Sequence, residues 1–162
     1  MAARGDQSAG TVRFVDSREM KVDASPEKAF EPIDLIGGAT GWYYADWLWR
    51  LRGRIDTLFG GVGMDRGRHR QFSLRVGDKI DCWRVEAYEP NRLLRLGAEM
   101  QLAGRGWLEF QVSANGSFST IRQTATYEPD GLLGRVYWYL AYPFHHLLFR
   151  GMLRGIAGRV VR

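Results

Sequence analysis

The spacing of hydrophobic residues changes along the chain and divides it into helical and extended segments. Between Gln71 and Tyr127, apolar residues recur at every second position in short runs separated by Gly, Pro and Asn, a pattern typical of half-buried strands. An earlier run, 11–22, predicts a first strand, and Asn115-Gly116 is a strong hairpin signal. Because the connections are short, the pattern predicts an antiparallel meander over residues 71–76, 80–88, 94–100, 107–112 and 118–127.

Two helices are predicted between the first strand and the meander. Ser25-Pro26-Glu27 is typical of a helix start, because it offers a serine N-cap, a proline at the first helical position and an early acid. Gly37-Gly38 ends that helix. Residues 44–59 predict a second helix, with an ion pair between Arg52 and Asp56 on its solvent side. Its inward stripe is predicted to be Tyr44, Trp47, Leu48, Leu51, Ile55, Leu58 and Phe59.

The second of these helices lies in an aromatic-rich run between Gly37 and Gly63. Such a cluster of large rings either fills a core or lines an apolar pocket. Trp42 and Trp49 fall outside the predicted inward stripe, so we expect them at the edge of a cavity or of a partner surface. The flanking glycines are interpreted as hinges around a helical lid.

Residues 132–161 form one long apolar segment with helical period. Arginines and histidines interrupt it, so it is a poor candidate for crossing a membrane, and no membrane role is expected. The aromatic run from Tyr137 to Tyr142 leaves contact with a membrane surface open, although packing on the sheet is the simpler interpretation. The stripe expected to face the sheet is Val136, Leu140, Phe144, Leu147, Met152, Ile156 and Val160.

A sheet with one apolar face needs a cover, and the C-terminal helix is the only predicted element long enough to lie across it. We therefore predict an α+β fold, in which a curved antiparallel sheet wraps around the long helix, with two small helices after the first strand. Residues 11–162 are expected to form one domain after a flexible tail, 1–10, which lacks the apolar run of a signal peptide.

Composition narrows the classes of function. The net charge of +5 rests mostly on arginine, which we interpret as general basicity, so no nucleic-acid partner is expected. The single cysteine, Cys82, excludes an intramolecular disulfide and fits a reducing, cytoplasmic compartment. Cys82 shares its strand parity with Arg84 and Glu86, so we expect it at an outward or edge position and not as a nucleophile.

Several segments resemble a known superfamily. Residues 22–30, Val-Asp-Ala-Ser-Pro-Glu-Lys-Ala-Phe, resemble the first strand and small helix of the START, Bet v 1 and polyketide-cyclase superfamily (SRPBCC), whose fold is the helix grip. Residues 41–49, 60–64, 75–78, 83–86 and 134–139 resemble its DUF2867 branch, and the likeness covers about Val12 to Ala157. The resemblance implies a cavity between sheet and long helix that holds apolar ligands. Members often follow an NAD(P)-binding short-chain-dehydrogenase-like domain, so the chain is either a standalone member or an excised one.

Candidate sites for ions and cofactors are sparse. Gly60-Gly61-Val62-Gly63 lacks the spacing and the preceding strand of a dinucleotide loop, so no cofactor is expected. His145 and His146 would point about 100° apart on a helix and cannot share one metal, so no metal site is expected. A basic cluster could contact an anion at a cavity mouth, although a solvated loop is the favoured interpretation; its members are Arg66, Arg68 and Arg70.

Gln123 is the most informative polar residue. It shares the apolar strand face of Ile121 and Ala125, where an amide is costly unless it finds a partner. It either orients a ligand or only fixes the core by bonding to Tyr127 or to the main chain. The residues expected to line a cavity are Trp42, Trp47, Trp83, Met100, Phe110, Gln123, Tyr127, Tyr137 and His145.

The sequence favours a domain that binds a small, mostly apolar molecule, because it shows no convergent set of acid and base groups. The first alternative is an enzyme of the polyketide-cyclase or dehydratase type, in which Gln123, Tyr127 or His145 orients a carbonyl. The second alternative is an accessory domain that docks a short-chain-dehydrogenase-like partner through exposed aromatics.

Overall fold

A computed structural model describes residues 12–38, 40–61, 74–99 and 103–160. Its elements follow the predicted order, which is one strand, two short helices, further strands and one long helix. They are β1 (Phe14–Val22), α1 (Pro26–Asp34), α2 (Asp46–Leu58), β2 (Lys79–Ile80), β3 (Trp83–Glu89), β4 (Leu93–Ala98), β5 (Gly104–Asn115), β6 (Phe118–Pro129) and α3 (Gly131–Val160).

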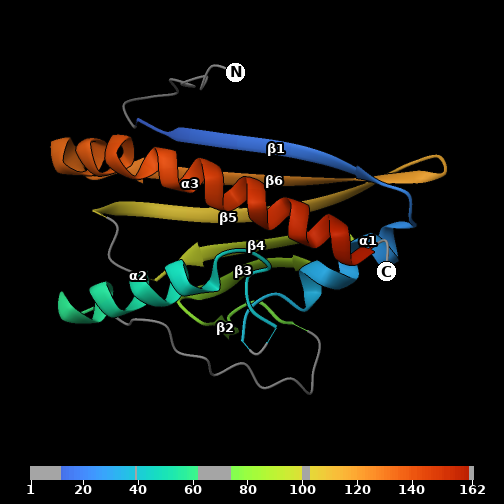
Figure 1. Cartoon of the computed structure of the whole chain (residues 1–162), viewed down its shortest axis with the longest axis horizontal. Helices are drawn as coiled ribbons and strands as arrows, with labels where there is room; N and C mark the ends of the chain where they lie inside the picture. The colour runs from blue at the N-terminus through green and yellow to red at the C-terminus, as the bar shows by residue number, and fades with distance from the viewer. Residues whose placement is uncertain (1–11, 39, 62–73, 100–102, 161–162) are drawn as a thin grey trace.

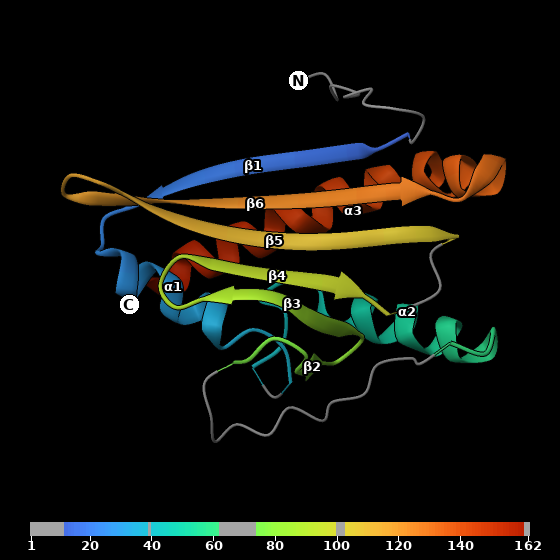
Figure 2. The same cartoon turned by 180° about the vertical axis from the view of Figure 1, so that it is seen from behind.

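The strands form one antiparallel sheet in the order β1-β6-β5-β4-β3-β2. The chain runs as a meander from β2 to β6, as the sequence predicted. β1 then pairs with β6 along its whole length, from Phe14 opposite Tyr127 to Val22 opposite Ser119. The β5–β6 hairpin turns at Gly116, whose φ of 66° costs a glycine no steric strain. Figure 2 shows the outer face of the sheet with no described helix over it.

The three helices lie on the other face of the sheet and enclose the core. α3 crosses the sheet diagonally and packs on β1 and β6, while α2 lies on the same side toward β3 and β4 (Figure 1). The alternation predicted for the strands is confirmed most clearly in β4, β5 and β6, where the side chains on the inner face are buried. Those core residues include Leu94 and Leu96 of β4, Leu108 and Phe110 of β5, and Ile121 of β6. The predicted stripe of α1 is also buried, namely Ala29, Phe30 and Ile33, followed by Ile36.

The predicted orientation of α2 is wrong. Trp47, expected to face inward, is 64% exposed, and Leu58 is 83% exposed, whereas Trp49 is buried. The Arg52–Asp56 pair, 3.6 Å apart and expected in solvent, lies on the inner side with Asp56 only 1% exposed. The spacing had correctly grouped residues by face, but the stacking of Trp49 on other buried rings decides which face is inward.

The predicted stripe of α3 is right in its second half and wrong in its first. Met152 and Ile156 are fully buried, but Val136, Leu140, Phe144 and Leu147 are exposed. The helix is apolar on most sides, so its period does not select one face. Close packing selects it instead: a Cβ on Gly134 would lie 2.4 Å from the Ala103 carbonyl oxygen, and one on Gly151 would lie 2.3 Å from the Tyr44 ring.

Two strand predictions also fail before β3. Asp81, with φ of 54°, turns the chain between β2 and β3, so the predicted strand 80–88 is interrupted. The alternation of faces therefore does not run through Cys82 as predicted. Cys82, expected at an outward position, is therefore only 3% exposed. The predicted strand 71–76 is also not formed at residues 74–76, which pair with no neighbouring strand. Instead, the Arg75 N–H donates to the Asp78 carboxylate in a turn. Phe72 lies outside the described residues.

Candidate functional site

A continuous row of aromatic rings lies between the sheet and the helices. It begins on β6 and α3, where Tyr127 stacks on Trp138 at 5.6 Å between centroids. His145 follows at 6.1 Å from Trp138, and Phe149 at 5.5 Å from His145. Trp49 of α2 then lies 6.4 Å from Phe149. These rings come from elements that are far apart in the sequence. We call them the inner aromatic row; its members are Tyr127, Trp138, His145, Phe149, Trp49, Trp83 and Trp42.

Three tryptophans close one end of the inner aromatic row. Trp42 lies 5.2 Å from Trp49 and 5.9 Å from Trp83, and all three side chains are buried. The Trp42 indole N–H donates to Asp81 Oδ2 at 2.9 Å, and the Gly38 N–H donates to the same oxygen at 3.2 Å. These bonds fix the loop before α2 against the turn between β2 and β3, and so orient Trp42 toward its neighbours.

Four polar atoms along this row are buried without a hydrogen-bond partner among the described residues. They are Trp49 Nε1, Trp83 Nε1, Gln123 Oε1 and His145 Nδ1. A fifth such atom is Oδ1 of Asp81, the carboxylate whose other oxygen accepts from the Trp42 indole. Native proteins bury few unpaired polar atoms, because each costs about 1–3 kcal/mol of desolvation. A group of them on the inner side of the sheet therefore indicates hydrogen-bond partners other than the side chains that the structure describes.

Gln123 occupies the inner face of β6 as predicted and is only 1% exposed. Its amide Nε2 donates to Met152 Sδ of α3 at 3.3 Å, a weak acceptor, and its Oε1 accepts nothing among the described residues. The interpretation that Gln123 bonds Tyr127 is not what the structure shows, since the Tyr127 hydroxyl donates to the Ala103 carbonyl at 2.9 Å. The amide is thus half satisfied in the middle of the sheet.

His145 is a neutral histidine at physiological pH. Burial, and then the positive charge of Arg52, lower its pKa from 6.5 to about 4, and Asp16 opposes this only in part. Burial also raises the pKa of Tyr127 to about 12, with Tyr137 and Asp130 adding to the effect. His145 and Tyr127 are therefore both uncharged near neutral pH, which suits contact with an apolar molecule.

Cys82 is unsuited to nucleophilic chemistry. Burial, and next the negative charge of Asp81, raise the pKa of its thiol to about 12. A thiol that stays protonated at neutral pH is a poor nucleophile and a poor metal ligand. Within the part of the chain that the structure describes, no group of three or more His, Cys, Asp or Glu side chains could hold a metal ion.

The structure brings most of the sequence-predicted lining residues to one side of the sheet. Trp42, Trp83, Phe110, Gln123 and Tyr127 are buried there, and Tyr137 and His145 are half-buried. Trp47 is the exception, because it faces solvent. Met100, Arg66, Arg68 and Arg70 lie outside the described residues. Sequence reasoning missed Trp138 and Phe149 as members of the row and expected Trp49 only at the edge of a cavity or of a partner surface. These rings meet through contacts between distant segments, which local spacing does not report.

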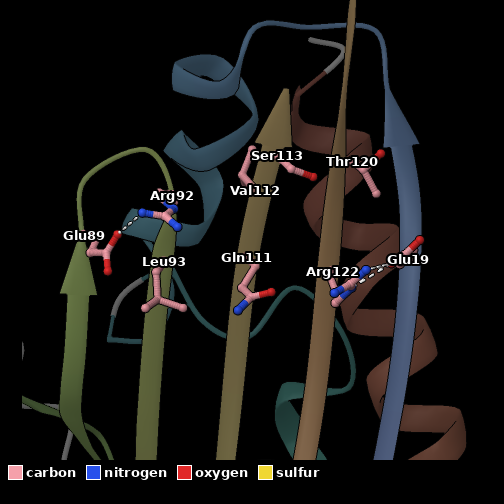
Figure 3. Close-up of a pocket in the computed structure, with 9 residues that line it drawn as sticks. All are labelled: Glu19, Glu89, Arg92, Leu93, Gln111, Val112, Ser113, Thr120 and Arg122. Carbon is pink, nitrogen blue, oxygen red and sulfur yellow. Dashed lines mark hydrogen bonds and ion pairs between the residues drawn. The ribbon is translucent and has the colours of Figure 1, made fainter. Parts of the chain in front are cut away.

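The outer face of the sheet carries two shallower hollows. One, of about 230 Å³, crosses β4, β5, β6 and β1 near one end of the sheet and is drawn in Figure 3. Its arginines are already paired: Arg92 with Glu89, and Arg122 with Glu19 (Figure 3). The other, of about 360 Å³, includes the Arg13–Glu128 pair and Trp107. In the first hollow both arginines already have carboxylate partners, so it is not a strong anion site. In the second, Arg13 is paired in the same way and Arg105 lies over the Trp107 ring.

Comparison with known proteins agrees with this architecture. Truncated norcoclaurine synthase from Thalictrum flavum has a TM-score of 0.55 at 12% identity, covering 97% of this chain and 99% of that one. The Mll3558 protein from Rhizobium loti has a TM-score of 0.53 at 14% identity, covering 93% and 99%. TTHA0849 from Thermus thermophilus has a TM-score of 0.50 at 16% identity, covering 91% and 97%. At these identities the likeness concerns the fold alone. No curated protein matches the chain.

The curved antiparallel sheet, the two small helices and the long C-terminal helix define a helix-grip fold, as the sequence resemblance implied. The family model described as "Protein of unknown function (DUF2867)" matches residues 8–152. The chain therefore belongs to the DUF2867 family. In the described residues, no helix has a long enough stretch of apolar residues to cross a membrane.

Proposed function

We propose that this protein binds a small, mostly apolar molecule between the inner face of the sheet and helices α2 and α3. The observation that carries the proposal is the set of buried polar atoms without partners along the inner aromatic row. Small-molecule sites combine apolar and aromatic walls with a few polar groups that orient the ligand, and the row has this composition.

The chemistry of the four atoms defines what such a ligand should carry. The indole N–H groups of Trp49 and Trp83 can only donate, and Gln123 Oε1 can only accept. A ligand with an apolar body, a carbonyl or ether oxygen and a hydroxyl would satisfy both kinds of group. His145 adds a neutral imidazole, which can act in either sense.

Binding is favoured over catalysis by the state of the residues that would perform it. In the cyclase or dehydratase alternative, Gln123, Tyr127 or His145 orients a carbonyl. The Tyr127 hydroxyl already donates to the Ala103 carbonyl, and its raised pKa keeps it protonated. The likeness to norcoclaurine synthase concerns the fold and assigns no reaction here. The family match and the structures named above give no support to a dehydrogenase partner.

Native mass spectrometry of freshly purified wild-type protein and of Gln123→Leu tests the proposal. We expect the wild type to retain a small organic adduct and Gln123→Leu to lose it. Leucine also removes the unpaired amide oxygen, so the free energy of unfolding should rise by about 1 kcal/mol. Gln111→Leu is the matched control, because Gln111 lies on the neighbouring strand and bonds Glu109 at 2.9 Å on the outer face.

Two results would contradict this function. One is a bare wild-type chain that a panel of apolar alcohols and ketones also fails to stabilise against heat, which would assign the unpaired atoms to ordered water. The other is an adduct retained equally by Gln123→Leu, which would show that the amide only fixes the core.

A further inference from the structure

The outward faces of α2 and α3 are apolar, although both helices also bury an apolar inner face. On α3, Leu132 is 78% exposed, Leu140 71% and Phe144 65%. Both helices lie on the same side of the sheet (Figure 1). Soluble monomers seldom expose contiguous apolar patches of more than a few hundred Å² without a function. We call this the helix face; its apolar members are Trp47, Leu51, Ile55, Leu58, Leu132, Val136, Tyr139, Leu140, Phe144 and Leu147.

Helical geometry makes the outward residues of α3 one continuous stripe. Leu132, Val136, Leu140 and Phe144 follow one another at four-residue intervals, so they lie along one side of the helix. The opposite side is already packed, since Trp138 stacks on Tyr127 and Met152 is buried against Gln123. The fold therefore does not use the outward stripe for packing between its own helices and sheet.

Positive charge accompanies the stripe. Eighteen residues make five helical turns, so exposed Arg150 lies on the same side of α3 as Leu132, and exposed Arg154 lies one turn beyond it. On α2, exposed Arg50 and Arg54 lie about one and two turns beyond Trp47 on the same side of the helix. The sequence of α3 contains no aspartate or glutamate, so its outward face carries charge of one sign only.

From this arrangement we propose that the helix face docks on the surface of an anionic lipid bilayer. The leucines and aromatic rings enter the boundary between headgroups and acyl chains, and the arginines meet the lipid phosphates. A second copy of the chain is a poorer occupant, because a symmetric pair would set the arginines of one face against those of the other. Neither helix spans the bilayer; both lie along it.

The sequence left contact of the aromatic run from Tyr137 to Tyr142 with a membrane surface open, and packing on the sheet was the simpler interpretation. It placed Val136, Leu140, Phe144 and Leu147 against the sheet. Their exposure moves the apolar stripe of α3 to the surface and leaves its arginines beside it.

Co-sedimentation with vesicles tests the proposal on the full chain. We expect binding to vesicles of phosphatidylcholine mixed with phosphatidylglycerol, and much weaker binding to phosphatidylcholine alone. Leu140→Glu combined with Phe144→Glu should lower the partition coefficient by at least about tenfold, since it replaces inserted apolar groups by charges. Val76→Glu is the matched control, because Val76 is 65% exposed and lies on neither helix.

A second variant isolates the electrostatic part. Arg150→Gln combined with Arg154→Gln should weaken binding by about tenfold or more and reduce its dependence on salt, because each arginine near an anionic surface contributes about fivefold. Thermal unfolding of every variant shows whether its fold is intact, which we expect because all four substituted helix positions are exposed.

Three outcomes would overturn the proposal. The first is no binding to the mixed vesicles. The second is binding that the Leu140 and Phe144 substitutions leave unchanged. The third is a stable dimer in sedimentation velocity that those same substitutions dissociate, which would assign the helix face to a second copy of the chain.

Discussion

Acid should destabilise this protein through one half-buried histidine, His145. His145 is held between Trp138 and Phe149, and burial with the nearby charge of Arg52 lowers its pKa from 6.5 to about 4. The unfolded chain therefore takes up a proton near pH 6.5, while the folded chain takes it up only near pH 4. Between these values the unfolded state binds more protons, so stability is complete above pH 6.5 and falls as the pH drops. At 1.36 kcal/mol per pKa unit, the full loss is about 3 kcal/mol.

Urea unfolding followed by tryptophan fluorescence, at a series of pH values from neutral to about 4.5, measures this loss. Carboxylates also titrate in this range, so the informative quantity is the difference between the wild type and His145→Asn, which cannot ionise. That difference should change by about 2–3 kcal/mol across the series. His146→Asn is the control, because His146 is the exposed neighbour. Equal pH slopes for the wild type and His145→Asn would refute the reasoning.

Three further predictions follow from close contacts and burial. Gly155→Ala should lower the free energy of unfolding by about 2 kcal/mol in thermal unfolding, since its Cβ would lie 2.6 Å from the Tyr43 carbonyl oxygen. Gly158→Ala, which has open space around it, should raise that free energy by about 0.5 kcal/mol in the same measurement. The Cys82 thiol should be almost inert to Ellman's reagent in the native state and react quickly in urea, because its pKa is raised to about 12 and it is buried; fast native reaction would contradict this. Trp42→Phe should cost about 3 kcal/mol in urea unfolding, because buried Asp81 loses a donor at 2.9 Å; an unchanged midpoint would show that the bond is dispensable.

The sheet could be predicted closely from the sequence. Successive residues of a strand point to opposite faces, so alternation reports directly which side chains are buried once one face is covered. Leu94, Leu96, Leu108 and Phe110 were placed on the buried face for this reason, and so was Gln123. The inward position of a polar amide was therefore visible before the structure, although its half-satisfied bonding was not.

The helices could not be oriented in the same way. Helical spacing groups residues by face, but α2 and α3 carry apolar residues on more than one face, so spacing alone leaves the choice open. In α2, the rings of Trp42, Trp83 and Phe149 attract Trp49 inward and leave Trp47 outside. The inner aromatic row joins three regions of sequence, and no local pattern could reveal it.

The sequence by itself therefore determined the order of the elements, the buried side of the sheet and the family, because these depend on local periodicity and on short segments. The tertiary structure alone decided which face of each helix is buried, because that depends on contacts between distant residues. Gly134 must approach the Ala103 carbonyl, and the rings of the inner aromatic row must stack on one another. Those contacts create both the unpaired polar atoms of the proposed binding site and the exposed apolar stripe of the helix face.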